Sequence, residues 1–229
     1  MRIGGLQKFS LIDYPGKMSA VIFTQGCNFR CPYCYNTELV IPKQFGPTIP
    51  ELAVMLFLAR RRSYLEGVVM TGGEPTQQAD LIPFLDKIKK LGYLIKLDTN
   101  GSHPRTLKKL IQLKLVDYIA MDVKAPLAKY NQVAGVNVPV EPIQESIQLI
   151  LHAGIEYEFR TTLVRPLCSQ DDLAELLRSI EGVQRYTIQR FIPCEKVLDQ
   201  TLLGKDHYSQ EEIEEIKIKW ERQSTPLTV

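Results

Sequence analysis

Short runs of apolar residues alternate along the chain with longer stretches in which apolar residues recur every three or four positions. The short runs are rich in Val, Ile, Phe and Tyr at consecutive positions, which is typical of strands buried on both faces. The longer stretches have the period of helices, and several begin with a helix start signal. The expected strands cover residues 20–24, 68–71, 94–98, 118–122, 156–162 and 186–193, and the expected helices cover residues 48–61, 78–91, 104–113, 142–153, 169–180 and 209–222.

The repeated order of strand followed by helix predicts a parallel α/β fold. A closed eight-unit barrel takes about 250 residues, so we expect a partial (β/α)6 TIM-like barrel in a single domain over residues 1–229, with its core at about 18–194. Residues 1–17 are too polar and glycine-rich for another unit and are expected to form a short hairpin or cap. Residues 195–229 are expected to form a helical tail. A doubly wound sheet is the alternative, although no Gly-x-Gly-x-x-Gly follows the first expected strand.

Composition narrows the function classes. Apolar residues make up 45% of the chain and charged residues 24%, which is ordinary for a globular protein. The 28 Lys and Arg nearly balance the 26 Asp and Glu, so nothing points to nucleic acid or to an anionic membrane as a partner. The longest apolar run, residues 52–59, is far shorter than the roughly 20 residues of a membrane span. No signal peptide is recognisable at the N-terminus, and we expect a cytoplasmic protein.

Polar and chemically reactive residues gather where the expected strands end. In barrels of parallel strands, chemistry takes place at the carboxyl ends of the strands. Strand-to-helix turns are often polar in any protein, but that tendency explains neither the cysteines nor the two turns of the form Asp-x-Asn-Gly and Asp-x-Lys. The strand ends read Gln25-Gly26-Cys27, Gly72-Gly73-Glu74-Pro75, Asp98-Thr99-Asn100-Gly101, Asp122-Val123-Lys124 and Pro193-Cys194-Glu195.

The cysteines are the strongest signal. Three of the five lie in one C-x3-C-x2-C motif at Cys27, Cys31 and Cys34, which is not the spacing of a disulfide framework. Three thiolates can hold three irons of a [4Fe–4S] cluster and leave the fourth iron open to a substrate or cofactor. A structural zinc site is the alternative. It needs a fourth ligand from Cys168, Cys194 or a histidine.

The cysteine motif with an aromatic residue before its last cysteine, followed by Gly-Gly-Glu-Pro after the second strand, resembles the radical S-adenosylmethionine (SAM) superfamily. The resemblance covers about residues 26–194. It implies a radical SAM oxidoreductase in which Cys27, Cys31 and Cys34 hold one [4Fe–4S] cluster. The fourth iron of that cluster would be chelated by the amino and carboxylate groups of SAM.

The same resemblance implies contacts to SAM from two of the turns. Tyr33 fills the aromatic position and is expected to lie by the adenine. Gly72, Gly73 and Glu74 are expected to meet the methionine amino group. Glycines let the backbone approach closely, and carbonyls with a carboxylate complement an ammonium.

The next two strand ends add four candidate residues. Asp98 and Asn100 are expected at the ribose hydroxyls. Lys124 is expected at the SAM carboxylate, and Asp122 is expected to face SAM, substrate or a cation. As alternatives, Asp98 caps its own turn and Lys124 is a solvated surface lysine. Arg160 lies within an expected strand, where a lone cation is costly, so it is expected to pair with a carboxylate of the site.

Within the superfamily, the opening residues 5–17 and the stretch 23–34 resemble the anaerobic ribonucleotide reductase activating proteins. That resemblance implies reductive cleavage of SAM to a 5′-deoxyadenosyl radical, which takes a hydrogen atom from a glycine of a partner glycyl radical enzyme. The partner expected is anaerobic ribonucleotide reductase, and the electron donor expected is a flavodoxin- or ferredoxin-type protein. Relatives commonly carry histidine after the third cysteine, where this chain has Tyr35 and Asn36.

Two other functions stay open from the sequence. One is a small-molecule radical SAM enzyme such as a 7-carboxy-7-deazaguanine synthase, which would need a magnesium site and substrate-binding arginines. The other is a non-enzymatic zinc or iron–sulfur binding module. Cys168 and Cys194 are expected to be ordinary apolar thiols, and two cysteines cannot hold a second cluster with the usual four thiolates.

Overall fold

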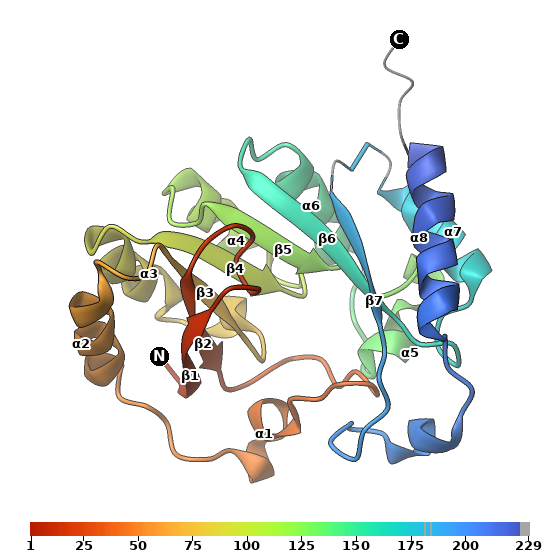
Figure 1. Cartoon of the computed structure of the whole chain (residues 1–229), viewed down its shortest axis with the longest axis horizontal. Helices are drawn as coiled ribbons and strands as arrows, with labels where there is room; N and C mark the ends of the chain where they lie inside the picture. Colours follow the sequence, from red (N-terminus) through yellow and green to blue (C-terminus); the bar gives the residue numbers. More distant parts are fainter. Residues whose placement is uncertain (181, 184, 225–229) are drawn as a thin grey trace.

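The computed structural model describes residues 1–180, 182–183 and 185–224 of the chain (Figure 1). Its strands form one seven-stranded sheet in which they follow one another in sequence order. The first strand pairs antiparallel with the second, and all later pairs are parallel. The strands are β1 (Ile3–Ser10), β2 (Ser19–Thr24), β3 (Gly67–Gly72), β4 (Leu94–Thr99), β5 (Tyr118–Asp122), β6 (Glu156–Leu163) and β7 (Tyr186–Arg190).

The helices between the parallel strands lie on the outer side of the curved sheet, and the last helix stands beside β7 (Figure 1). The α-helices are α1 (Thr37–Val40), α2 (Glu51–Arg61), α3 (Leu81–Lys90), α4 (Pro104–Gln112), α5 (Tyr130–Ala134), α6 (Glu141–Leu151), α7 (Gln170–Ser179) and α8 (Gln210–Ser224). Short 3-10 turns cover Pro42–Gln44, Pro75–Gln77, Leu127–Lys129 and Gln200–Gly204. None of the helices within the described ranges is long and apolar enough to span a membrane.

The sequential strand order confirms the partial barrel. A doubly wound sheet reverses its strand order at a switch point, whereas here every crossover moves to the next strand in the same direction, so that alternative is wrong. β1 and β7 are the two edges of the described sheet. The last strand is shorter than the expected 186–193 and ends at Arg190. The segment beyond it includes Pro193, which has no backbone N–H to donate to a sheet.

The N-terminal residues form a hairpin that also caps the barrel. β1 pairs with β2 along its length, so this segment belongs to the sheet. Tyr14, in the turn between the two strands, is 4% exposed, and its ring centroid lies 5.9 Å from that of Tyr118. Tyr14 approaches Gly67 so closely that a Cβ on that glycine would lie 2.7 Å from the tyrosine ring. The hairpin therefore closes the amino-terminal end of the barrel, opposite the cysteines.

The inner face of the sheet changes from apolar to charged along the barrel axis. Val21, Val69 and Ala120 pack with the two tyrosines at the amino-terminal end. Toward the carboxyl ends, β4, β5 and β6 carry charged side chains instead. This end of the barrel contains a cavity of about 440 Å³.

Candidate active site

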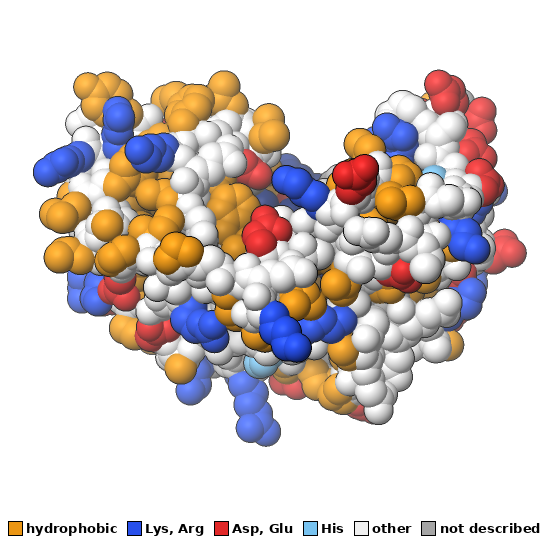
Figure 2. Space-filling view, turned by 90° about the horizontal axis from the view of Figure 1, so that it is seen from below, with side chains coloured by type: hydrophobic (Ala, Val, Ile, Leu, Met, Phe, Trp, Pro, Cys, Tyr) orange, Lys and Arg blue, Asp and Glu red, His pale blue; other side chains and the backbone are white. Residues whose placement is uncertain are grey.

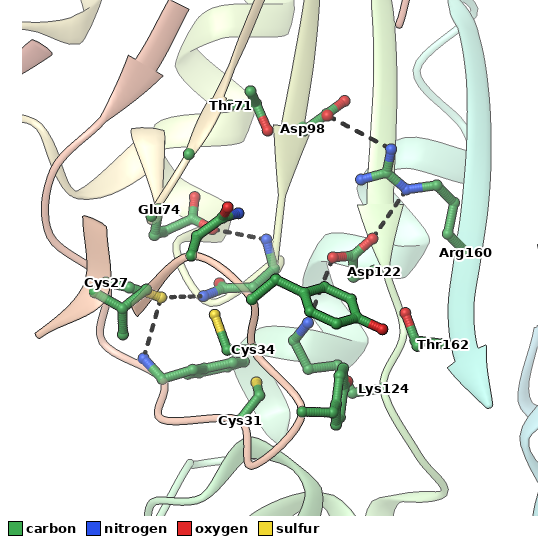
Figure 3. Close-up of a pocket in the computed structure, with 18 of the residues that line it drawn as sticks. Cys27, Cys31, Cys34, Thr71, Glu74, Asp98, Asp122, Lys124, Arg160 and Thr162 are labelled. Atoms are coloured by element: carbon green, nitrogen blue, oxygen red, sulfur yellow. Dashed lines mark hydrogen bonds and ion pairs between the residues drawn. The ribbon is translucent and has the colours of Figure 1, made fainter. Parts of the chain in front are cut away.

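The side chains that the sequence singles out for the site line one cavity of about 440 Å³ at the carboxyl ends of the parallel strands (Figure 3). The fold therefore brings together four turns that are far apart along the chain. The lining includes Cys27, Cys31, Tyr33, Cys34, Gly72, Gly73, Glu74, Asp98, Asn100, Asp122 and Lys124.

The three cysteines lie on the loop between β2 and α1, and the loop is held by its own backbone and by Arg30. The Arg30 guanidinium donates hydrogen bonds of 2.7 Å to the carbonyls of Cys27 and Phe29. The Cys34 N–H donates to the carbonyl of Cys31 at 2.9 Å. These bonds keep the loop compact, so its three thiols stay at one side of the cavity.

Residues 191–209, which we call the C-terminal strap, hold the same loop from outside. The backbone N–H groups of Leu198 and Asp199 donate to the carbonyls of Cys34 and Pro32, at 3.1 and 2.9 Å. Tyr35 donates its hydroxyl hydrogen to the Ile192 carbonyl and accepts from the Ile192 N–H, both at 2.8 Å. The expected helical tail is thus in part an irregular segment that reaches back to the cysteines. Its last five residues, 225–229, lie outside the described residues.

The environment of the thiols suits an iron–sulfur cluster. Burial, followed by the nearby Glu74 carboxylate, raises the pKa of Cys27 to about 12, and burial also raises the pKa of Cys31 and Cys34. Thiolates in such a place need a bound cation to offset their charge. Within the described part of the chain, no three His, Cys, Asp or Glu side chains converge on a single ion position. A soft, all-sulfur donor set spread over one loop fits separate irons of a cluster.

The turn after β3 packs directly on the start of the cysteine loop. The Gly73 N–H donates to the Thr24 carbonyl at 2.9 Å, and the Glu74 N–H donates to the Gly26 carbonyl at 2.8 Å. A Cβ on Gly73 would lie 2.1 Å from the Gly26 carbonyl oxygen. Gly72 has a φ of +111° and would place a Cβ 2.4 Å from the Thr24 nitrogen. Both glycines are therefore required by close contacts between two backbone segments of this chain, independently of any contact with a cofactor.

Glu74 connects this turn to the turn after β4. Its carboxylate is fully buried and accepts from the Thr76 backbone at 3.0 Å, the Thr99 hydroxyl at 2.8 Å and the Asn100 backbone at 2.7 Å. The Thr76 hydroxyl donates to it as well. Burial raises the pKa of Glu74, and these hydrogen bonds oppose that rise. These hydrogen bonds fix the Glu74 carboxyl group, which thereby aligns two turns of the site.

Charged side chains of alternating sign cross the inner face from β4 to β6. Within this set, which we call the charge row, Lys96 contacts Asp98 at 2.6 Å and Glu158 at 3.8 Å. Arg160 contacts Asp98 at 3.5 Å and Asp122 at 2.9 Å, and Asp122 also contacts Lys124 at 3.4 Å (Figure 3). The charge row consists of Glu158, Lys96, Asp98, Arg160, Asp122 and Lys124.

The charge row answers three questions that the sequence left open. Arg160 pairs with carboxylates of the site, as its position predicted. Lys124 is only 11% exposed, so the surface-lysine alternative is wrong. Asp98 pairs with Lys96 on the same strand and with Arg160 across the sheet, whereas a turn-capping aspartate would bond its own backbone. Burial would raise the pKa of Asp122, but the charges of Arg160 and Lys124 outweigh it and lower that pKa.

Tyr33 closes the cavity on the cysteine side. It is 6% exposed, and the Lys124 ammonium lies 5.9 Å from its ring centroid. Its ring meets the edge of Phe191, in the C-terminal strap, with centroids 6.5 Å apart. The aromatic wall is therefore held both by a cation of the charge row and by the strap.

Several lining residues are not evident from the sequence. Thr71, Thr99 and Thr162 line the cavity, and the sequence places them at or near strand ends without indicating a role for them. Lys96 had a readable signal, because a lysine in the middle of an apolar strand must find an ionic partner inside the protein. The hydrogen bond from Thr99 to Glu74 depends on the turns after β3 and β4 lying side by side, which the sequence does not show.

Comparisons with known proteins match the part of the chain that carries the candidate site. The family described as the Radical SAM superfamily matches residues 21–180. The chain is 36% identical over 197 residues to a candidate glycyl-radical enzyme activating enzyme of Methanocaldococcus jannaschii, and the match covers 83% of this chain and 80% of the relative. It is 25% identical over 194 residues to the pyruvate formate-lyase-activating enzyme of Clostridium pasteurianum, with coverage of 80% and 79%.

Among solved structures, Streptococcus suis SuiB bound to S-adenosylmethionine superposes with a TM-score of 0.70 at 15% sequence identity. The match covers 89% of this chain and 46% of SuiB, so this chain spans about half the length of that structure. At this identity the similarity shows a shared fold.

Proposed function

Because the chain belongs to the radical SAM superfamily, we propose that it activates a glycyl radical enzyme by removing a hydrogen atom from one glycine of that partner. The observation that supports this most directly is the convergence of three thiols and the charge row on one cavity. Family membership implies a [4Fe–4S] cluster and SAM. We propose which residues bind the cluster and which bind SAM.

Cys27, Cys31 and Cys34 would each bind one iron and leave the fourth iron for the methionine end of SAM. When bound and reduced by a flavodoxin- or ferredoxin-type donor, the cluster and SAM supply a 5′-deoxyadenosyl radical that takes hydrogen from a C–H bond. The backbone around the thiols is already fixed by Arg30 and the C-terminal strap. Binding the cluster then requires little rearrangement of the loop.

The rest of the cavity would bind and orient SAM. Lys124 would bind the SAM carboxylate. The backbone carbonyls of Gly72 and Gly73 would accept hydrogen bonds from the SAM ammonium, and Asp98 would accept them from the ribose hydroxyls. Tyr33 would cover the adenine. Each of these groups is held by partners within the protein, so SAM would enter a site with the polar groups already in position.

A protein partner is supported by the names of two relatives and by the shape of the barrel. The relatives from M. jannaschii and C. pasteurianum carry names of activating enzymes. The sheet leaves β1 and β7 as edges, and the surface seen from below is hollowed between two lobes (Figure 2). A loop of a large partner could reach the cavity from such an open side. Anaerobic ribonucleotide reductase is the partner we propose, from the resemblance of the opening residues.

The test is anaerobic incubation of the reduced, cluster-loaded protein with SAM and anaerobic ribonucleotide reductase, followed by electron paramagnetic resonance. We expect a doublet from a radical on a glycine of the partner. Cys31→Ala should abolish both the doublet and SAM cleavage, since it removes one iron ligand. Cys194→Ala is the matched control and should keep both activities, because Cys194 lies outside the motif.

Two outcomes would contradict the proposal. SAM cleavage without a radical on any glycyl radical partner would favour a small-molecule substrate, such as that of a 7-carboxy-7-deazaguanine synthase. Stoichiometric zinc without iron after anaerobic purification would favour a binding module.

A further inference from the structure

The geometry of Asn100 departs from its expected role at the ribose of SAM. It lies in the turn after β4, is 6% exposed and lines the cavity beside Cys27. A ribose contact needs a free carbonyl lone pair or a free amide hydrogen. The contacts of the Asn100 side chain decide whether either is left.

All four hydrogen-bonding positions of the Asn100 amide are taken. Its Oδ1 accepts from the Ser102 N–H at 3.0 Å and from the Ser102 hydroxyl at 2.6 Å. Its Nδ2 donates to Asn28 Oδ1 at 3.0 Å and lies 4.0 Å from the sulfur of Cys27. An asparagine side chain has two acceptor and two donor positions. Nothing remains for a ribose hydroxyl unless one of these contacts breaks.

The orientation of this amide is fixed by the protein. A backbone N–H can only donate, so the Ser102 N–H requires the oxygen of Asn100 on its side. The NH₂ group must then point toward Asn28 and Cys27. In the reversed orientation two carbonyl oxygens, those of Asn100 and Asn28, would face each other.

The network around Asn100 closes on itself between two loops. Asn28 follows Cys27 directly in the cysteine loop, and its Nδ2 donates to the Ser102 hydroxyl at 2.8 Å. The Ser102 hydroxyl gives its only hydrogen to Asn100, so His103 Nδ1, which lies 2.8 Å from it, must be a donor. The ring of bonds through Asn28, Asn100 and Ser102 ties the cysteine loop to the turn after β4.

We infer that Asn100 is a positioning residue for the cluster, which directs an amide N–H at the Cys27 sulfur, and that Asn28 and Ser102 hold it in that orientation. The Phe29 N–H donates to the same sulfur at 3.4 Å, so Cys27 receives donors from two directions (Figure 3). Hydrogen bonds to cluster sulfurs help to set the reduction potential. A donor stabilises the extra negative charge of the reduced cluster, so it raises that potential.

This inference rests on the proposed ligation of the cluster by Cys27, and its test is a redox titration of the cluster-loaded protein without SAM or partner. Asn100→Leu should lower the ratio of reduced to oxidised cluster about threefold at a fixed potential, or roughly 28 mV for one electron. Asn100→Asp should lower it further, because it places a carboxylate beside the sulfur. Ser102→Ala should lower the same ratio by less than Asn100→Leu does. It also provides a second test of the inference if the variants at position 100 do not take up the cluster.

The control is Gln189→Leu, which removes an amide from the same cavity on β7. It should leave the potential unchanged. SAM affinity, measured by binding to the oxidised protein, should be the same in Asn100→Leu and in the native protein. An unchanged potential in the Asn100 and Ser102 variants would overturn the inference, and weaker SAM binding at an unchanged potential would restore the ribose role. If the proposed function is wrong, the native protein will bind no cluster through Cys27, and this outcome differs from an unchanged potential in the variants.

Discussion

At the scale of single residues, Arg160 controls the charge of the cavity. Its guanidinium contacts both Asp98 and Asp122, and all three side chains are mostly shielded from solvent. The two aspartates raise the pKa of Arg160 although burial alone would lower it, so the group stays protonated. Without this cation, two carboxylates would face the same cavity with only lysines beside them.

Arg160→Met should therefore destabilise the protein by about 2 kcal/mol, because it leaves carboxylates uncompensated in a poorly solvated place. The measurement is chemical unfolding of the anaerobic holoprotein. Arg165→Met is the matched control, since Arg165 pairs with Asp206 and Glu212 at the surface, and exposed pairs contribute little. Equal losses in the two variants would show that burial of the Arg160 pairs is unimportant.

The residue scale also shows what the sequence can and cannot tell. The spacing of Cys27, Cys31 and Cys34 is local, so it could be read directly. The pairing of Arg160 could be anticipated from the cost of a lone cation in a strand. The saturation of the Asn100 amide could not, because it depends on Asn28 and Ser102, and Asn28 lies 72 residues away from Asn100 along the chain.

At the scale of elements, the site depends on how its turns pack against one another. From the sequence, Gly72 and Gly73 were expected to let the backbone approach a cofactor. The structure shows that they also approach Thr24 and Gly26, at the start of the cysteine loop. A side chain here would move the loop itself.

Gly73→Ala should reduce the iron content per chain and destabilise the protein by roughly 1–3 kcal/mol, since the added Cβ overlaps the Gly26 carbonyl. Gly46→Ala is the control, because a Cβ at Gly46 would meet nothing within 4 Å. Iron analysis after anaerobic reconstitution measures the effect. If Gly73→Ala binds as much iron as Gly46→Ala, the close packing of the two turns is not required.

The C-terminal strap is the second element on which the cysteine loop depends. Tyr35 makes both of its hydroxyl hydrogen bonds to Ile192, and its ring stacks on Phe191 with centroids 5.8 Å apart. Residues 191–193 were expected to end the last strand, and residues 195–209 of the strap were expected to belong to a helical tail. Apart from the 3-10 turn Gln200–Gly204, the strap has no regular secondary structure and no periodicity, so its course could not be predicted from the apolar pattern.

Tyr35→Phe keeps the ring stack and removes the two hydrogen bonds. We expect iron release to a chelator to become roughly fivefold faster, from the loss of about 1 kcal/mol of net hydrogen bonding. Tyr64→Phe is the control, since Tyr64 is 65% exposed and lies on the loop before β3. Identical release rates in the two variants would mean that the strap does not protect the cluster.

At the scale of the whole molecule, the fold separates stability from chemistry along the barrel axis. The Tyr14 hairpin and the apolar inner residues fill one end, and the charge row and the cysteine loop occupy the other. The strands β2, β3 and β5 could be predicted because they are buried on both faces and give continuous apolar runs, whereas β6 alternates buried and partly exposed residues. β1 could not be placed in the sheet, because its polar and glycine-rich residues match the alternation of an edge strand only weakly.

The partial closure of the barrel follows from the same topology. Seven strands in sequential order leave two edges in the described sheet, with β1 on one side and β7 on the other. The short helices α1 and α5 were not expected, since four- and five-residue helices carry too little periodicity to detect. The helix α5 nevertheless matters to the site, because a Cβ on Gly135, the residue that caps its C-terminus, would lie 2.0 Å from the Arg30 carbonyl oxygen.

The central claim is that one iron of a three-cysteine cluster is free to bind SAM inside this cavity. It is tested most directly by electron–nuclear double resonance on the anaerobically reduced protein, mixed with SAM that carries an isotope label on its methionine amino nitrogen. The account predicts a hyperfine coupling between the cluster and the labelled nitrogen. A cluster that shows no such coupling and carries a fourth ligand from the chain itself would contradict it.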